Sequence, residues 1–175
     1  MAGVARFVDI MELDPDIEDS PGAIDINIEH ADIAFENVTF SYNDNANVLT
    51  DLSFNVAAGE TVAIVGPSGA GKTTLVNLIP RFYEIEKGNI RIDGIDIKDV
   101  TQRSVRDNIG IVQQDVFLFT GSVRDNIAYG NIDATDEEIV AAAKRANAHE
   151  FIMEMEEGYE TYIGERGVKL SGGQK

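Results

Sequence analysis

One nine-residue stretch, GPSGAGKTT at residues 66–74, constrains the fold of this chain more than any other feature. It fits the pattern G-x-x-x-x-G-K-[ST], in which glycines let the backbone turn its N–H groups inward and a lysine and a hydroxyl follow. A short apolar run of β-forming residues, 61–65, precedes it, and residues 74–79 are typical of a helix. This order predicts a buried parallel strand, a glycine-rich loop and a helix, and therefore an α/β fold.

The fixed positions of this loop each supply part of a phosphate-binding site. Backbone N–H groups at the start of a helix present partial positive charge to phosphate oxygens. Lys72 adds a full charge for the β- and γ-phosphates, and the Thr73 hydroxyl can ligate Mg²⁺. We expect a nucleoside triphosphate here, and the alternative is a glycine-rich turn without a ligand. The loop residues expected to contact it are Gly66, Pro67, Ser68, Gly69, Ala70, Gly71, Lys72, Thr73 and Thr74.

The last residues of the chain, LSGGQK at 170–175, carry a second motif. A serine followed by two glycines exposes backbone N–H groups and predicts another anion site at a helix start. Together with the phosphate loop, this motif resembles the ATP-binding cassette (ABC) ATPases, whose signature is LSGGQ. The resemblance implies that Ser171, Gly172, Gly173 and Gln174 contact a second ATP. The alternative is a flexible glycine loop.

Two further positions of the family can be matched in this sequence. The family places an aromatic residue upstream of the phosphate loop to stack on adenine, and Tyr42 matches it. The alternative is that Tyr42 continues the buried alternation of Val38 and Phe40 along a strand. The family's Q-loop glutamine reaches the Mg²⁺ ion and the attacking water. Gln114 matches it because it directly precedes an acidic residue, and Gln113 is the competitor.

Two segments resemble the exporter branch of the family. GERG at residues 164–167 resembles the X-loop, which in ABC exporters touches the cytoplasmic loops of the membrane domain. A charged surface turn is the alternative. VFLF at residues 116–119 is apolar for a connecting segment, as an ordinary core segment would also be. In exporters this neighbourhood receives the coupling helix, so the resemblance implies the transmembrane domain of the same transporter as a partner.

The family's remaining hydrolytic motifs follow the signature and would lie beyond Lys175. They are the Walker B strand with its aspartate, the catalytic glutamate and a switch histidine. The resemblance implies that an intact member is an ATPase, with Lys72 and Gln114 acting at the reacting phosphate. Thr73 and Gln114 would lie at the Mg²⁺ ion. We expect residues 1–175, as a C-terminally incomplete domain, to bind nucleotide but to be inactive in hydrolysis.

Charge and patterning divide the chain into an N-terminal segment and one domain. Residues 1–31 are predominantly acidic and are expected to form a linker that follows a transmembrane domain outside this sequence. The alternative is a disordered acidic tail. The net charge of −17 argues against nucleic acid as a partner. No apolar run approaches the roughly eighteen residues of a membrane helix. Cysteine does not occur in the sequence, which suits a cytoplasmic setting, and the exporter resemblance implies a position at the cytoplasmic face of the membrane.

Residues 32–175 are expected to form the N-terminal part of an ABC nucleotide-binding domain, with an α/β P-loop NTPase fold. Its expected parts are an antiparallel β-subdomain, a partial RecA-like parallel core and an α-helical subdomain. Alternation at 33–42 and 48–56 predicts antiparallel strands, and a slip in it near Asn37 predicts a bulge. The sequence Asp93-Gly94 predicts a type I′ hairpin turn.

The remaining elements follow from local patterns. Residues 109–113 predict a second buried strand of the parallel core. The helical subdomain is expected at about residues 115–175. The order Thr135-Asp136-Glu137-Glu138 predicts a capping box at the start of one of its helices.

The resemblance implies the ATP-binding domain of an ABC exporter, which couples ATP binding and hydrolysis to export of a substrate. In the family two such domains pair head to tail, and each ATP lies between the phosphate loop of one and the signature of the other. A soluble ABC ATPase of DNA repair or translation is one alternative. A nucleotide-binding regulatory module without a transport role is another. The membrane helices set the cargo, so this sequence names no transported substrate.

Overall fold

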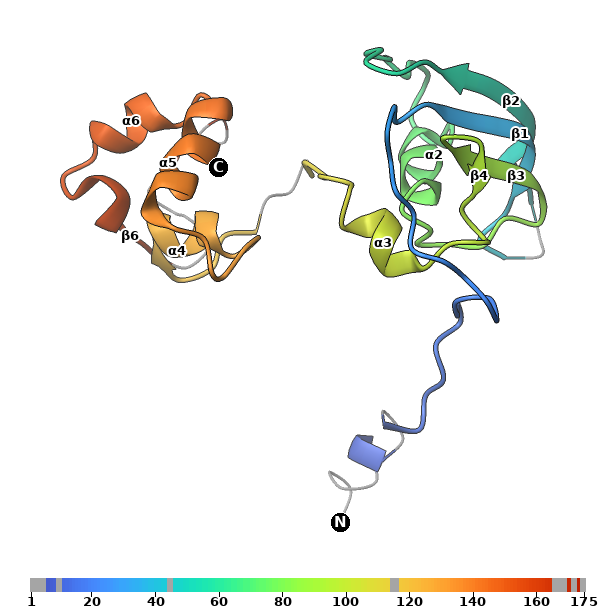
Figure 1. The fold of residues 1–175 in the computed structure, drawn as a ribbon, viewed down its shortest axis with the longest axis horizontal. Helices are drawn as coiled ribbons and strands as arrows, with labels where there is room; N and C mark the ends of the chain where they lie inside the picture. The colour runs from blue at the N-terminus through green and yellow to red at the C-terminus, as the bar shows by residue number, and fades with distance from the viewer. Residues whose placement is uncertain are drawn as a thin grey trace. The chain divides into compact units, whose positions relative to one another are not determined.

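The computed structural model describes residues 6–8, 11–43, 46–113, 117–164, 170 and 173. The chain divides into two compact units, Met1–Gly110 and Ile111–Lys175. Unit 1 contains an antiparallel sheet and short helices, and unit 2 is mainly helical (Figure 1). Within the described ranges, every helix is too short or too polar to cross a lipid bilayer.

The sheet of unit 1 has four strands, which pair in the order β2-β1-β3-β4, antiparallel throughout. Helix α2 lies beside this sheet (Figure 1). The antiparallel β-subdomain predicted from the alternating residues is therefore formed. In chain order the elements are β1 (Ile33–Phe40), β2 (Leu49–Val56), α2 (Lys72–Leu78), β3 (Lys87–Ile92), β4 (Ile95–Asp96) and α3 (Gln102–Arg106).

A bulge in β1 decides which side chains reach the core. The pairing of β1 with β2 shifts register after Phe35, and Asn37 has a positive φ of 50°. Phe35 and Val38 are both buried because the extra residue returns the chain to the same face. Gly88 crosses this bulge so closely that a Cβ would lie 2.3 Å from the carbonyl oxygen of Glu36. The predicted bulge is confirmed, and it requires a glycine in the neighbouring strand.

The hydrophobic core of unit 1 is formed by one face of the sheet and the inner side of α2. Phe35 also stacks on Phe54 of β2, with ring centroids 4.6 Å apart. The apolar residues of this core with little exposed surface are Ile26, Phe35, Val38, Phe40, Leu49, Leu75, Leu78, Ile85, Ile90, Ile92, Ile97, Val100 and Val105.

The turn between β3 and β4 fastens the segment that leads into β1. Asp93 and Gly94 have φ values of 50° and 76°, as a type I′ turn requires, so the predicted hairpin is confirmed. The Asp93 carboxylate accepts backbone N–H groups from Glu29, His30 and Asp32 at 2.6, 3.0 and 3.1 Å. These N–H groups, with that of His30 contributing most, lower the pKa of Asp93 from 3.8 to about 2.

We predict that Asp93→Asn destabilises unit 1 at pH 7, since asparagine suits the positive φ but lacks the charge. The folded pKa lies below the unfolded value, so the carboxylate's contribution is present above pH 3.8 and is lost as the pH falls to about 2. Thermal midpoints from circular dichroism should therefore differ most at pH 7 and converge near pH 2. Asp99→Asn, at an exposed site, is the control. A constant difference across this range would contradict the role of the ionised carboxylate.

The later part of the predicted linker packs on unit 1. Ile24 forms a parallel bridge with Val100, and the Thr101 N–H donates to the carbonyl oxygen of Ile24 at 2.9 Å. Ile26 is only 7% exposed and belongs to the core. The backbone N–H of Gln102 donates to the Asp19 carboxylate at 2.9 Å. The assignment of residues 1–31 to a linker remains a prediction about a longer protein.

The two strands predicted for a parallel core are not formed. Residues 61–65 and 109–113 contain no strand, and Val65 and Val112 are 87% and 96% exposed. A buried parallel strand needs hydrogen-bonded neighbours and packed layers on both faces. Among the described residues, no strand pairs with either range. Apolar composition alone therefore predicted strands at these two segments that the described structure does not contain.

Unit 2 begins its regular structure with two capped helices. Thr135 and Glu138 bond each other's backbone N–H groups at 3.3 and 2.8 Å, so the predicted capping box is confirmed. Ser122 and Asp125 form a second capping box that the sequence analysis did not identify. The elements are β5 (Gly121–Ser122), α4 (Val123–Ala128), α5 (Asp136–Arg145), α6 (His149–Met153), a 3₁₀ turn η1 (Gly158–Glu160) and β6 (Tyr162–Ile163).

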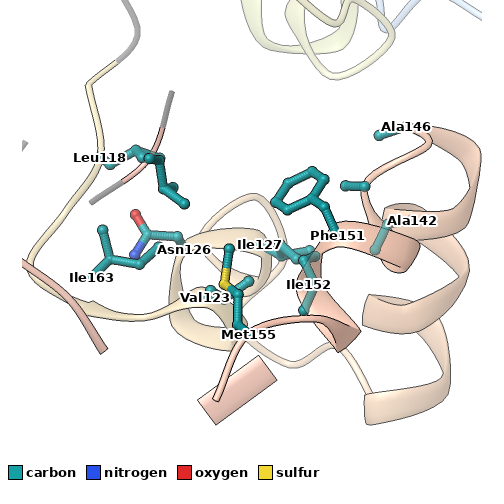
Figure 2. A pocket seen from close by; sticks show the side chains of 13 residues that line it. Leu118, Val123, Asn126, Ile127, Ala142, Ala146, Phe151, Ile152, Met155 and Ile163 are labelled. Atoms are coloured by element: carbon teal, nitrogen blue, oxygen red, sulfur yellow. The ribbon is translucent and has the colours of Figure 1, made fainter. Parts of the chain in front are cut away.

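The core of unit 2 borders an open apolar pocket of about 320 Å³. Figure 2 shows Val123, Phe151 and Ile152 among the side chains that line it. The polar lining residue is Asn126, whose amide bonds the Phe119 N–H and the carbonyl oxygens of Phe119 and Ser122 at 2.8–2.9 Å. The amide of Asn126 is therefore already bonded to the backbone.

Candidate functional site

The glycine-rich loop leads directly into α2 and leaves the start of that helix open. Gly69 and Gly71 both have a φ of 81°, a conformation that residues with a Cβ rarely adopt. A Cβ on Gly71 would also lie 3.0 Å from the Leu49 side chain. Gly71 is the N-cap of α2, and no side chain caps it. The first N–H groups of α2 therefore remain available to an anion.

Lys72 lies across this loop. Its ammonium group donates to the carbonyl oxygens of Gly66 and Pro67 at 2.9 and 2.7 Å. The charge is thereby held over the backbone that a phosphate would approach. Thr73, at the next position of α2, is exposed. The loop thus presents an ammonium group, a hydroxyl and open N–H groups within one short segment.

Tyr42 lies next to the same helix. Its hydroxyl is 2.9 Å from the Thr74 hydroxyl, and either group can donate. Tyr42 follows the end of β1 and is 48% exposed, whereas Phe40 within the strand is 2% exposed. The alternative in which Tyr42 continues the buried face of the strand is therefore wrong. An aromatic ring and the phosphate loop are brought together within unit 1, although stacking on a base stays a prediction.

The aromatic ring beside Tyr42 was not identified in the sequence analysis. Tyr83, in the turn between α2 and β3, has its ring centroid 5.0 Å from that of Tyr42 at an interplanar angle of 88°. Phe40 meets Tyr42 at 4.9 Å and 84°. Tyr83 belongs to no motif, and only its position after the phosphate-loop helix could have marked it as a neighbour.

Several predicted site residues lie outside the described residues. These are Gln114 of the Q-loop, Ser171, Gly172 and Gln174 of the signature, and residues 165–167 of the GERG segment. The competitor Gln113 is exposed. Gly173 is described and lies in an exposed turn. Leu170, which opens the signature, packs against the core of unit 2. The roles of these residues stay predictions.

Unit 2 carries an exposed aromatic cluster, which we define as Phe117, Phe119 and Tyr129. Phe119 lies 5.1 Å from Phe117 and 4.3 Å from Tyr129 between ring centroids. These side chains are 65%, 43% and 65% exposed in the order Phe117, Phe119 and Tyr129. Large apolar side chains gathered on a surface are typical of an interaction site. The cluster includes part of the apolar segment at 116–119 noted in the sequence.

The comparisons with known proteins agree with these motifs. The family model described as "ABC transporter" matches residues 49–175. The chain is 54% identical over its whole length to "Uncharacterized ABC transporter ATP-binding protein YwjA" of Bacillus subtilis (strain 168). It is 53% identical, again over its whole length, to "Putative multidrug export ATP-binding/permease protein YgaD" of the same organism. It spans 30% of the length of both relatives.

A solved structure gives the same result for the fold. It is described as a bacterial Atm1-family ABC exporter with ATP bound. It matches 99% of this chain with a TM-score of 0.92 and 45% sequence identity, and the match covers 30% of that exporter chain. The α/β P-loop NTPase fold of ABC ATPases, predicted from the motifs, is thereby confirmed.

Proposed function

The chain belongs to the ABC transporter family as an ATP-binding domain of the exporter type, and we propose that it binds MgATP at the loop of residues 66–74. The observation that carries this proposal is the 2.9 Å contact between the hydroxyls of Tyr42 and Thr74. It joins the predicted adenine platform to the phosphate loop within one compact unit. A triphosphate on the loop and a base on the ring then require no rearrangement between units.

Each loop group has a distinct task in this proposal. The N–H groups at the start of α2 and the Lys72 ammonium would hold the phosphate oxygens. Lys72 would exchange its bonds to the Gly66 and Pro67 carbonyl oxygens for bonds to phosphate. The remaining loop residues, Ser68, Gly69 and Ala70, would follow the phosphates with their backbone.

The donor groups at this site suit Mg²⁺, which usually takes one or two protein oxygens together with phosphate oxygens and water. Thr73 is exposed at the start of α2, so its hydroxyl can provide one ligand. Gln114 is proposed as a second contact from the Q-loop. The ion supplies charge neutralisation at the phosphates when it is bound.

Within a longer protein we propose that ATP binding and hydrolysis drive export of a substrate. Ser171, Gly172, Gly173 and Gln174 would contact the ATP of a second, head-to-tail ATP-binding domain. The exposed aromatic cluster in unit 2 is proposed to receive part of the transmembrane domain, because its rings offer apolar surface to a partner. Residues 1–31 would lead from that domain, which places the ATP-binding domain at the cytoplasmic face of the membrane.

The test of this site uses two changes at Tyr42. Tyr42→Ala removes both the ring and the hydroxyl, and aromatic stacking on a base is worth about 1–3 kcal/mol, so MgATP binding should weaken about five- to 150-fold. Tyr42→Phe keeps the ring and loses only the Thr74 contact, so a loss of a few-fold is expected. Titration calorimetry measures both affinities. If the two variants lose the same affinity, the stacking role is wrong.

A further inference from the structure

Tyr42 depends on neighbouring side chains for its orientation. It follows the end of β1, where the Val48 N–H donates to the Phe40 carbonyl oxygen at 2.8 Å. The ring therefore lies beyond the hydrogen-bonded strands. Among the described residues, it contacts the Thr74 hydroxyl, the Phe40 ring and the Tyr83 ring.

Phe40 and Tyr83 contribute differently to this arrangement. Phe40 is 2% exposed and forms part of the buried core. Tyr83 is 39% exposed and meets Tyr42 edge to face, at 88° and 5.0 Å between centroids. It also contacts Phe40 at 5.7 Å. Edge-to-face geometry is a favourable arrangement for two rings. Tyr83 is therefore a partly exposed ring that supports Tyr42 from outside the core.

The segment that carries Tyr83 is fastened to the segment that carries Tyr42. Glu86 donates its backbone N–H to the Thr39 carbonyl oxygen at 3.0 Å. The carboxylate of Glu86 also accepts a hydrogen bond from the Ser41 hydroxyl. These two bonds hold the turn before β3 against the end of β1. The contact between Tyr83 and Tyr42 thus belongs to a fixed arrangement of two chain segments.

We propose that Tyr83 is a positioning residue for nucleotide binding, which holds the Tyr42 ring in the orientation that receives the base. This inference rests on the proposed function of the phosphate loop and Tyr42. A ring held before the ligand arrives loses less conformational entropy on binding. Tyr83 acts through Tyr42 and is expected to contribute to recognition of the base and not of the phosphates.

The experiment compares a ligand that has a base with one that has none. Tyr83→Ala should weaken MgATP binding about two- to tenfold, the range expected for an edge-to-face ring contact. Binding of inorganic tripolyphosphate with Mg²⁺, which engages the loop alone, should be unchanged. Tyr83→Phe keeps the ring and should bind both ligands as the unchanged chain does. Tyr83→Leu keeps apolar volume without the ring, so it should weaken MgATP binding as Tyr83→Ala does. It provides the test if Tyr83→Ala folds poorly.

Phe82→Ala is the matched control. Phe82 is the neighbouring residue with a similar exposure of 42%, but its ring lies 5.2 Å from the Arg106 guanidinium carbon. Its removal tests general loosening of the same turn and should leave MgATP affinity unchanged. Equal weakening of ATP binding by Phe82→Ala and Tyr83→Ala would overturn the proposal. Equal weakening of ATP and tripolyphosphate binding by Tyr83→Ala would also overturn it.

A double-mutant cycle separates positioning from direct contact. If Tyr83 acts through Tyr42, Tyr83→Ala should have no further effect on MgATP affinity in a Tyr42→Ala background. Additive losses would show that Tyr83 touches the base itself and would overturn the positioning role. Failure of the unchanged chain to bind MgATP would instead remove the proposed function. Normal ATP binding by Tyr83→Ala would remove this inference alone.

Discussion

Lys72→Ala should weaken MgATP binding by the chain about tenfold to a hundredfold. The ammonium group is the full positive charge of the loop, and a hydrogen bond to a charged group is worth about 1.5–3 kcal/mol. In the structure this group already lies over the loop, bonded to the Gly66 and Pro67 carbonyl oxygens at 2.9 and 2.7 Å. Titration calorimetry with MgATP measures the change in affinity.

Two controls separate the phosphate contact from other effects of this change. The chain has a net charge of −17, so removing any lysine increases its general repulsion of ATP. Lys87→Ala, at an exposed position at the start of β3, makes the same charge change away from the loop. Circular dichroism checks that the loop variant keeps its fold. If Lys72→Ala binds MgATP as tightly as Lys87→Ala, the assignment of the phosphate loop is wrong.

Motifs that depend on local backbone chemistry were predicted well from the sequence. The hairpin at Asp93-Gly94 follows from two residues that tolerate positive φ, and the capping box at Thr135 from side chains three positions apart. The bulge near Asn37 was visible as a slip in the alternation of apolar residues. In each case the residues that determine the geometry are neighbours in the sequence.

Features that depend on distant parts of the chain were predicted poorly or not at all. Residues 61–65 and 109–113 are apolar enough for buried strands, but a parallel strand also needs partners from elsewhere in the chain. Their side chains are instead largely exposed at Val65 and Val112. Sequence motifs identified Tyr42 and the phosphate loop separately. The contact of Tyr42 with Thr74 and its support by Tyr83 required the fold.

The last prediction concerns ATP hydrolysis. Residues 1–175 should bind MgATP but release phosphate at least about a hundredfold more slowly than a chain extended through the motifs that follow the signature in the family. A positioned general base contributes about 10²–10⁴ to such a rate. Among the described hydrogen bonds, Lys72 contacts two carbonyl oxygens and Thr74 contacts Tyr42. None of these partners is a carboxylate that could activate water.

The comparison requires equal occupancy, because a shorter chain could also turn over slowly through weak binding. The affinities of both chains should therefore be measured by calorimetry. Steady-state phosphate release is then measured at an MgATP concentration that saturates both chains. Lys72→Ala in the longer chain controls for a contaminating ATPase and should abolish most of its turnover. Equal turnover by the two unchanged chains at saturation would contradict the prediction. It would place a functional base within residues 1–175, and Asp115, which directly follows Gln114, would be the first acidic residue to substitute.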